Sequence, residues 1–408
     1  MQNTSHHAAL PGAPLGRALR SLWSLREDGI FLNHGSYGAV PLVVQQEQQR
    51  LRHEMEAHPD VFMHRMEPTP SGGAVRAVAA TFAAFVGAPP DRLALVENAT
   101  SGVQAVLNSL PFQHGDQILI TDHQYNAVRL AVEARCRETG AEPLVVRIPL
   151  PTDAATITQR VLDAAGPQVK FALLDHITSP TALVFPVQQI ATELRRRGIP
   201  VFVDGAHAVG QIPLDLAAIG ADWYVTNLHK WLYAPKGSAL LYASGSAAPL
   251  TQPLATSHYV AMGFPRSFDY VGTRDYTAWL AAPRALQFFQ ALGPARIQAH
   301  NAMLVKQGSE ALLSIGALAV APLDDCAAMR AFILPQTRPA RDSDAADVTR
   351  ALWDDERIQI RCTTQSGLLL LRFCAQAYVD AAELAQLARA LDQRSWPARK
   401  STTDTAVA

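Results

Sequence analysis

Val201-Phe-Val-Asp-Gly-Ala-His207 is a short apolar run that closes on a carboxylate, and it decides the fold that we predict. Gly198-Ile199-Pro200 precedes it and is a typical helix-to-strand connection. An apolar run of this length, bounded by such signals, is typical of a buried strand in a parallel sheet. Asp204 would then lie at the carboxyl edge, where open α/β sheets bind their ligands.

Similar runs of Val, Ile and Leu recur on both sides of this strand and alternate with segments of helical period. We expect seven strands in one mainly parallel sheet, over 93–96, 117–121, 144–148, 171–175, 201–204, 223–226 and 238–242. The helical period predicts helices over 74–85, 101–110, 127–139 and 187–197. This alternation indicates an α/β fold with helices covering the sheet.

The pattern changes near Pro283. We expect a smaller C-terminal α+β domain with helices over 294–313 and 381–391 and strands over 332–334, 358–361 and 367–373. The polar stretch 341–346 is expected to be an exposed loop. The predicted organisation is an N-terminal arm (1–33), a large α/β domain (34–283), the small domain (284–396) and a disordered tail (397–408).

The composition excludes several classes of protein. The chain has 408 residues, 49% of them hydrophobic, and a formal net charge of -1 without a basic run, so nucleic acid is not an expected partner. No signal peptide or membrane span is recognisable. Four scattered cysteines, without CxxC spacing, predict neither a metal site nor disulfides. These features favour a cytoplasmic protein without a metal.

A second strand is followed by Thr226-Asn-Leu-His-Lys-Trp231, which would bring the ammonium of Lys230 to the same edge as Asp204. Pyridoxal phosphate (PLP) requires such a pair, because a lysine holds it as a Schiff base while a carboxylate keeps the pyridine nitrogen protonated. Spacing alone equally allows Asp204 to cap the next helix and Lys230 to lie on the surface.

Glu97-Asn-Ala-Thr-Ser-Gly-Val103 follows a strand and opens a helix, so its free N–H groups and the hydroxyls of Thr100 and Ser101 could hold a phosphate. The signal is weak, since Thr and Ser are common helix N-caps. The stretch is not a Walker motif. Without GxGxxG it also argues against a nucleotide-binding Rossmann enzyme.

Taken together, these motifs resemble the class V aminotransferase family of fold type I PLP-dependent transferases, in its isopenicillin N epimerase-like and hercynylcysteine sulfoxide lyase-like branch. The resemblance covers nearly the whole chain. The motifs that carry it, in order, are Asn33-His-Gly-Ser-Tyr-Gly38, Asp122-His-Gln-Tyr-Asn-Ala127, His176-Ile-Thr-Ser-Pro180, Asp204-Gly-Ala-His207, His229-Lys-Trp231, Ala234-Pro-Lys-Gly237 and Gly272-Thr273.

The resemblance implies a set of cofactor contacts. Lys230 would form the Schiff base, Asp204 would pair with the pyridine nitrogen and His207 would contact the ring hydroxyl. Tyr125 would stack on the ring and serve as a second catalytic group, with His123 the less favoured stacker. The remaining cofactor contacts would be Thr100, Ser101, Ser179, Asn227, His229 and Thr273.

For the substrate, the resemblance implies that Arg372, in Leu371-Arg-Phe-Cys-Ala-Gln376, grips a carboxylate, with Asn33 and Tyr37 nearby. Cys374 stands where relatives commonly carry Ser, which leaves the shape of the substrate open. Gly272-Thr273 in relatives reaches the phosphate of the neighbouring subunit. This implies a homodimer with shared active sites.

Such an enzyme would act at Cα of an amino acid, and two reactions are expected before others: epimerisation and carbon-sulfur β-elimination. We favour epimerisation because the motif string resembles that branch. Cysteine desulfuration is disfavoured, because Cys326 and Cys362 do not have the expected spacing to Arg372. No residue in this sequence points specifically to transamination. A non-catalytic PLP-binding protein is disfavoured because the lysine is present.

Overall fold

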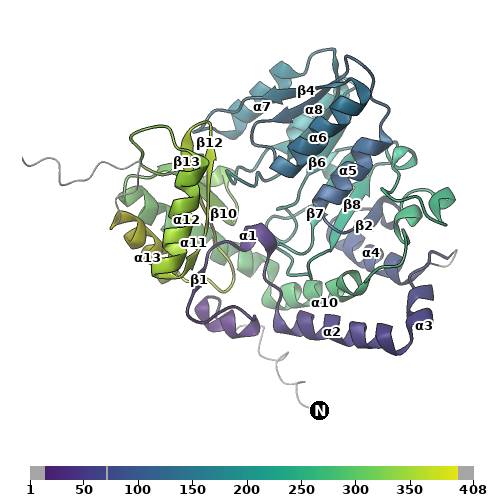
Figure 1. Ribbon diagram of the computed structural model, residues 1–408, viewed down its shortest axis with the longest axis horizontal. Helices are drawn as coiled ribbons and strands as arrows, with labels where there is room; N and C mark the ends of the chain where they lie inside the picture. Colours follow the sequence, from purple (N-terminus) through teal and green to yellow (C-terminus); the bar gives the residue numbers. More distant parts are fainter. Residues whose placement is uncertain (1–13, 70–71, 394–408) are drawn as a thin grey trace, which may run out of the picture.

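The computed structural model describes residues 14–69 and 72–393, and its centre is a seven-stranded sheet in the order β2-β8-β7-β6-β5-β3-β4 (Figure 1). All neighbours pair in parallel except β8, which is antiparallel to β2 and β7. The strands are β2 (Leu93–Val96), β3 (Gln117–Thr121), β4 (Glu142–Val146), β5 (Val169–Asp175), β6 (Val201–Asp204), β7 (Trp223–Asn227) and β8 (Ala239–Ala243).

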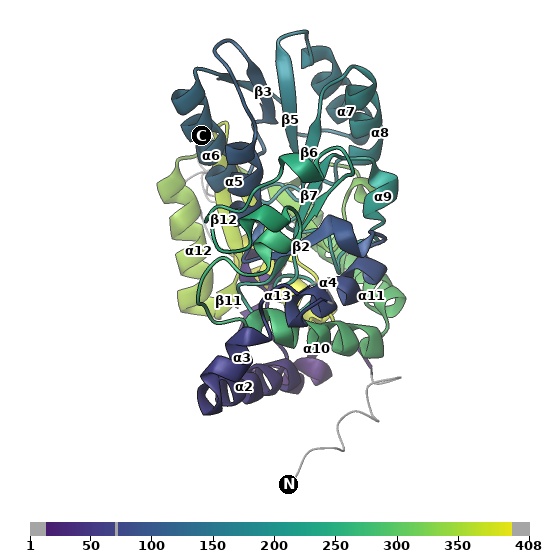
Figure 2. The same ribbon diagram turned by 90° about the vertical axis from the view of Figure 1, so that its right-hand side faces the viewer.

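Helices cover both faces of this sheet (Figure 2). Apolar side chains of α5 and α6 form one hydrophobic cluster with the sheet, whereas those of α4, α7, α8 and α9 belong to a cluster on the other face. The helices are α4 (Ala74–Phe85), α5 (Ala99–Ser109), α6 (Asn126–Thr139), α7 (Ala154–Ala164), α8 (Val187–Arg196), α9 (Leu216–Ile219) and α10 (Thr277–Leu292). Burial of both faces explains why the strands are almost wholly apolar.

The N-terminal segment crosses from the small domain to the large one. It contains β1 (Ile30–Phe31), α1 (His34–Tyr37), α2 (Leu42–Ala57) and α3 (Pro59–His64). β1 pairs in parallel with β11 (Ile358–Gln359) of the small domain, while α2 packs against α10 of the large domain. Figure 1 shows α1 between the two domains.

The small domain is an antiparallel sheet covered by helices. Its sheet has the order β12-β13-β10-β9. The elements are α11 (Pro294–Ser314), β9 (Leu318–Ala319), β10 (Met329–Ile333), α12 (Asp342–Glu356), β12 (Arg361–Gln365), β13 (Leu368–Cys374) and α13 (Ala381–Asp392).

The predicted fold class is confirmed, and all seven strands of the main sheet are present. β3 and β6 have the predicted bounds, whereas β4 begins two residues earlier than expected. Gly198 after α8 has φ 77°, a left-handed conformation that glycine adopts without strain. It ends the helix as the sequence predicted.

The exposed loop predicted over 341–346 is wrong, because these residues open α12. Asp344 accepts the backbone N–H of Arg341 at 2.8 Å and pairs with Arg338 at 2.7 Å. Acidic residues in a first turn cap the free N–H groups and favour the helix dipole. The polar residues of this stretch therefore start a helix and do not form a loop.

The expected domain boundary at residue 283 falls within α10, which contains Pro283. The predicted disordered tail, and the first thirteen residues of the predicted arm, lie outside the described residues.

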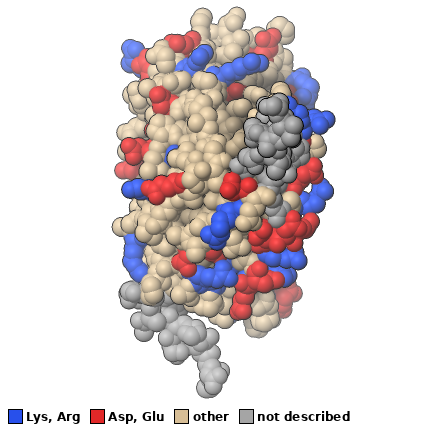
Figure 3. All heavy atoms as spheres, turned by 90° about the vertical axis from the view of Figure 1, so that its left-hand side faces the viewer, with Lys and Arg blue, Asp and Glu red and all other residues tan. Residues whose placement is uncertain are grey.

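The surface and composition give a few further facts. On the face seen in Figure 3, acidic and basic side chains are interspersed. Within residues 14–69 and 72–393, no helix has the length and apolarity needed to cross a membrane, and no group of three His, Cys, Asp or Glu could hold a metal ion. All four cysteines are free thiols.

Candidate active site

Lys230 lies just after β7, and its Nζ atom is 3.1 Å from Nε2 of His207. His207 follows β6, the parallel neighbour of β7. Parallel strands end at the same edge of a sheet, so the turns after β6 and β7 bring the two side chains together. The predicted meeting of these segments over one site is present in the structure.

The partners of His207 determine where its proton lies. Nδ1 of His207 accepts from the indole Nε1 of Trp231 at 3.4 Å. An indole N–H can only donate, so the neutral imidazole carries its proton on Nε2 and directs it at Lys230. Burial lowers the pKa of Lys230 to about 8 and that of His207 well below its usual value. The arrangement therefore favours the unprotonated, nucleophilic amine.

Two buried carboxyl groups stand side by side next to this amine. Asp175 ends β5, Asp204 ends β6, and the two are Cα partners in the parallel register. Their side chains therefore project from the same face of the sheet. Each residue is 2% exposed. Burial raises the pKa of both carboxyls, and for Asp175 the charge of Asp204 raises it further.

The hydrogen bonds of the two carboxyls differ. Oδ1 of Asp204 accepts the N–H of Ala206 at 2.9 Å. Oδ2 of Asp175 has no hydrogen-bond partner within residues 14–69 and 72–393. Sequence reasoning identified Asp204 and missed Asp175. The signal was the same for both residues, a carboxylate that closes an apolar strand.

The N-terminus of α5 offers hydrogen-bond donors at the same edge. Asn98 caps the helix by accepting the N–H of Ser101 at 2.9 Å, and Oδ1 of Asn227 accepts the N–H of Ala99 at 2.8 Å. Among the described residues nothing accepts the N–H of Thr100. Thr100, Ser101 and Asn227 are thus brought together around a helix N-terminus, which attracts anions.

His229 follows Asn227 and is held in one orientation. Its Nδ1 donates to the carbonyl oxygen of Ser238 at 2.9 Å, and burial lowers its pKa to about 4. Nδ1 therefore carries the proton of the neutral ring, and Nε2 is left to meet a ligand.

Arg372 is buried, and no acidic residue among 14–69 and 72–393 pairs with it. Its Nη1 donates to the carbonyl oxygen of Ser179, and its Nη2 donates to Oδ1 of Asn33 at 3.0 Å and Oγ of Ser36 at 3.1 Å. Its Nε has no partner, and no carboxylate in the described chain forms an ion pair with it. Desolvation of an unpaired guanidinium is costly, so this site is suited to an anion.

The two candidate stacking rings have different environments. His123 is fully buried, with Nε2 donating to the carbonyl oxygen of Ile148 at 3.0 Å and Nδ1 accepting from the hydroxyl of Thr181 at 2.7 Å. Both ring nitrogens are therefore occupied. Tyr125 is the N-cap residue of α6, and 47% of its surface is exposed. Tyr125 is the ring that remains free to meet a ligand.

Two predicted residues lie outside this cluster. Tyr37 is 75% exposed and lines a neighbouring hollow together with Asn33. Thr273 is exposed, and the next residue, Arg274, forms an ion pair with Glu97 just before α5. The segment of Thr273 thus lies near the start of α5 of its own chain.

None of the cysteines has the environment of an activated thiolate. Burial raises the pKa of Cys136 to about 11 and that of Cys362 to about 12, and it also raises those of Cys326 and Cys374. Cys374 is fully buried and accepts the N–H of Gly35 at 3.3 Å.

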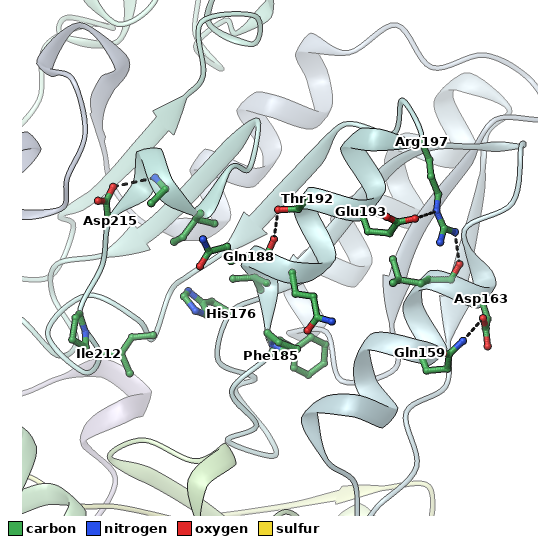
Figure 4. Close-up of a pocket in the computed structure, with 17 residues that line it drawn as sticks. Gln159, Asp163, His176, Phe185, Gln188, Thr192, Glu193, Arg197, Ile212 and Asp215 are labelled. Atoms are coloured by element: carbon green, nitrogen blue, oxygen red, sulfur yellow. Dashed lines mark hydrogen bonds and ion pairs between the residues drawn. The ribbon is translucent and has the colours of Figure 1, made fainter.

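A large hollow lies away from this cluster, on the face of the sheet covered by α7 and α8. Its volume is about 960 Å³, and Figure 4 shows Gln188 and Phe185 in its wall. Of the sequence motifs only His176 reaches it, and the ring of His176 is bonded to the hydroxyl of Tyr224 at 2.6 Å. The candidate catalytic side chains do not line this hollow.

Known proteins similar to this chain include isopenicillin N epimerases and L-cysteine desulfhydrases. The sequence model of the family "Aminotransferase class-V" matches residues 31–390. Isopenicillin N epimerase of Streptomyces clavuligerus is 33% identical over 88% of this chain and 94% of its own length. A putative L-cysteine desulfhydrase of Oryza sativa subsp. japonica is 33% identical over 66% of this chain and 59% of its own length.

Solved structures share the fold at low identity. The cystine C-S lyase C-DES, in complex with its product cysteine persulfide, has a TM-score of 0.77 at 21% identity, covering 90% of this chain and 98% of C-DES. A mutant of C-DES with glycine covalently linked to its PLP cofactor has a TM-score of 0.78 at 20% identity, covering 92% and 99%.

Proposed function

This chain belongs to the aminotransferase class-V family and is a PLP enzyme, and from that premise we propose that it epimerises an α-amino acid at Cα. The observation that carries the proposal is the contact at 3.1 Å between Lys230 Nζ and His207 Nε2. It holds an amine of lowered pKa beside the buried carboxyl of Asp204. Such an amine can take and return a proton near neutral pH.

The residues present fit the cofactor. An aldehyde needs a nucleophilic amine, which Lys230 supplies, and a pyridine nitrogen needs a buried carboxylate, which Asp204 supplies. A phosphate needs donors without partners, such as the N–H of Thr100 at the start of α5. Asn227 and His229 would complete that phosphate site. When bound, PLP withdraws electrons from Cα and thereby acidifies its proton.

Arg372 would bind the carboxylate of the substrate. It is buried, the described part of the chain offers it no acidic partner, and Asn33, Ser36 and Ser179 fix the direction of its guanidinium. A carboxylate held there would present its Cα toward the cluster around Lys230. This fixed orientation is what a stereochemical reaction requires.

Epimerisation needs two proton-handling groups, one on each side of Cα. Lys230 would act on one side, with its proton exchanged at Nζ beside His207. Tyr125 would act on the other side, since its side chain is exposed at the N-cap position of α6. Two relatives named isopenicillin N epimerase, 33% and 32% identical, support this choice.

The second candidate is carbon-sulfur β-elimination on a cysteine conjugate, and relatives named L-cysteine desulfhydrase support it. This reaction needs only the base on one side, so Lys230 would suffice. Desulfuration by a protein thiolate is less favoured. The pKa of each of the four cysteines is raised by burial, and a nucleophilic cysteine needs the opposite shift.

Proton NMR of the PLP-loaded protein in deuterated water separates these reactions. A panel of amino acids and cysteine S-conjugates would be followed for the Cα signal and for pyruvate, with the Lys230→Ala protein as the control. Loss of the Cα signal without pyruvate, together with formation of the opposite enantiomer, supports epimerisation. Pyruvate from a sulfur conjugate establishes a lyase. Retention of every Cα signal would refute proton abstraction altogether.

A further inference from the structure

The strand that carries Arg372 has a second arginine directly across from it. β12 and β13 are antiparallel, and Arg361 is the Cα partner of Arg372. Partners in an antiparallel pair project from the same face, with Cβ atoms about 5 Å apart. Like charges at such positions repel each other. Two adjacent cations in one sheet therefore call for an anion.

The protein does not supply that anion. Within the part of the chain that the structure describes, neither Arg361 nor Arg372 forms an ion pair with a carboxylate. The two cations differ in environment. Arg372 is buried, whereas Arg361 is exposed at the start of β12. The first can bind a group that is drawn into the site, and the second a group that stays near solvent.

Arg361 lines a hollow of about 1140 Å³ between the N-terminal segment and α12. Asn33 also lines it, and Asn33 accepts from Nη2 of Arg372 at 3.0 Å. One wall residue of the hollow, Asn33, therefore contacts Arg372, which is proposed to bind the substrate carboxylate. Asn126, the neighbour of Tyr125, is part of the same wall.

The wall of this hollow also contains the charged side chains of Arg350 and Asp342. Arg350 pairs with Asp347 at 3.6 Å. The carboxylate of Asp342 accepts the hydroxyl of Thr364. Among the described residues, Arg361 is the cation of this wall that forms no ion pair with a carboxylate, Asp342 included.

We propose that Arg361 forms a subsite for a second anionic group, so that the substrates are α-amino acids whose side chain ends in a carboxylate or another anion. The inference rests on the proposed function, because it takes Arg372 to bind the α-carboxylate. It adds the substrate class: the head group is held by Arg372, and the side chain extends past Asn33 into the hollow. Arg361 is a binding residue that takes no part in proton transfer.

The test uses acid and amide pairs that differ only in the distal charge: aspartate and asparagine, glutamate and glutamine, and the next longer homologues. Calorimetry with the PLP-loaded protein would give a dissociation constant for each compound. In the unmodified protein we expect the acid to bind about tenfold more tightly than its amide in at least one pair, as a charge-assisted contact provides.

Arg361→Gln is expected to reduce that ratio to about one, and Arg361→Lys to restore part of it. Arg350→Gln is the matched control, since Arg350 lines the same hollow but has its own partner. Arg372→Leu should weaken the acid and the amide alike. Equal binding of acid and amide in every pair, or an unchanged ratio in Arg361→Gln, would overturn the subsite.

The proposed subsite and the proposed reaction can be refuted independently. A charge-dependent ratio without loss of any Cα signal would keep the subsite and refute the reaction. Exchange at Cα without charge discrimination would keep the reaction and refute the subsite.

Discussion

At the scale of single residues, the site depends on which groups share a buried edge. Lys230 contacts His207, and the carboxyls of Asp204 and Asp175 lie beside them in register. Water is largely excluded from this edge, so each group shifts the pKa of its neighbours. A lysine of pKa about 8 results from burial, since Asp204 acts in the opposite direction.

Lys230→Ala is expected to abolish the visible absorption band of the PLP-loaded protein, because the amine that holds the cofactor is lost. Absorption spectra after incubation with PLP and gel filtration measure the change. Lys236→Ala is the control, since Lys236 lies in the next motif and its Nζ donates to the carbonyl oxygen of Gly38 at 3.3 Å. An unchanged band in Lys230→Ala would contradict the assignment.

Asp175→Asn is expected to change the affinity for PLP by less than about threefold, because two adjacent buried carboxyls cannot both be ionised cheaply and Asp175 is the one that stays neutral. Asp204→Asn should weaken binding by about tenfold or more, since it removes the anion. Titration of the apoprotein with PLP, followed by the visible band, measures both. Equal losses in the two variants would show that Asp175 acts as a charge.

At the scale of elements, strand ends and helix starts place the chemistry. β5, β6 and β7 end at one edge and deliver Asp175, Asp204 and the turn to Lys230. α5 starts at the same edge, with Asn98 as its cap and Asn227 of β7 bonded to its first N–H. The helix N-terminus and the amine therefore lie at one edge of the sheet.

Thr100→Val is expected to reduce the affinity for PLP by about 1–3 kcal/mol, because a hydroxyl that can donate to phosphate is replaced by a methyl group. Competition by inorganic phosphate should weaken in parallel. Ser109→Ala is the control, because Ser109 ends the same helix and bonds within it to Ala105. A loss of similar size in Ser109→Ala would mean that helix stability, not phosphate contact, is being measured.

At the scale of the whole molecule, the N-terminal segment connects the two domains at the site. His34 of α1 is fully buried, with Nε2 donating to the carbonyl oxygen of Lys230 at 2.9 Å and Nδ1 accepting from the hydroxyl of Tyr378 at 2.7 Å. One side chain thus touches the large domain and the small domain. Correct docking of these parts positions Lys230.

His34 should make the fold sensitive to acid. Burial lowers its pKa to about 3, from about 6.5 in an unfolded chain. The unfolded state therefore binds the proton first, and His34 costs up to about 1.4 kcal/mol of stability per pH unit as the pH falls below 6.5. Denaturant unfolding of wild type and His34→Gln from pH 7.5 to 4.5 measures this. Parallel stability curves would contradict the assignment.

The Gly272-Thr273 match predicts that the active protein is a homodimer, in which Thr273 serves the site of the other subunit. Thr273 is exposed, so a second subunit can reach it. Analytical ultracentrifugation of the PLP-loaded protein should therefore detect a dimer across the active concentration range. Full activity in a species that sediments as a monomer would refute a shared site.

Much of this architecture could be predicted from local sequence. The apolar runs that became β3 and β6 have their predicted bounds, because strands buried on both faces leave an uninterrupted apolar signal. The start of α12 was wrongly predicted to be a loop. Its first turn is polar because these side chains cap the free N–H groups of the helix. Asp175 was missed although its strand was found, because the family motif next to it begins at His176, whereas Asp204 opens a motif of its own.

By itself, the sequence determined the α/β class, the family motifs and the edge at which Lys230 and Asp204 meet. These properties follow from apolar periodicity and from residue types at strand ends, which are local. Only the tertiary structure decided that Asp175 pairs with Asp204, that Arg361 stands across from Arg372, and that His34 joins both domains. Register, burial and the absence of a counter-charge depend on segments far apart in the chain, and no local pattern encodes them.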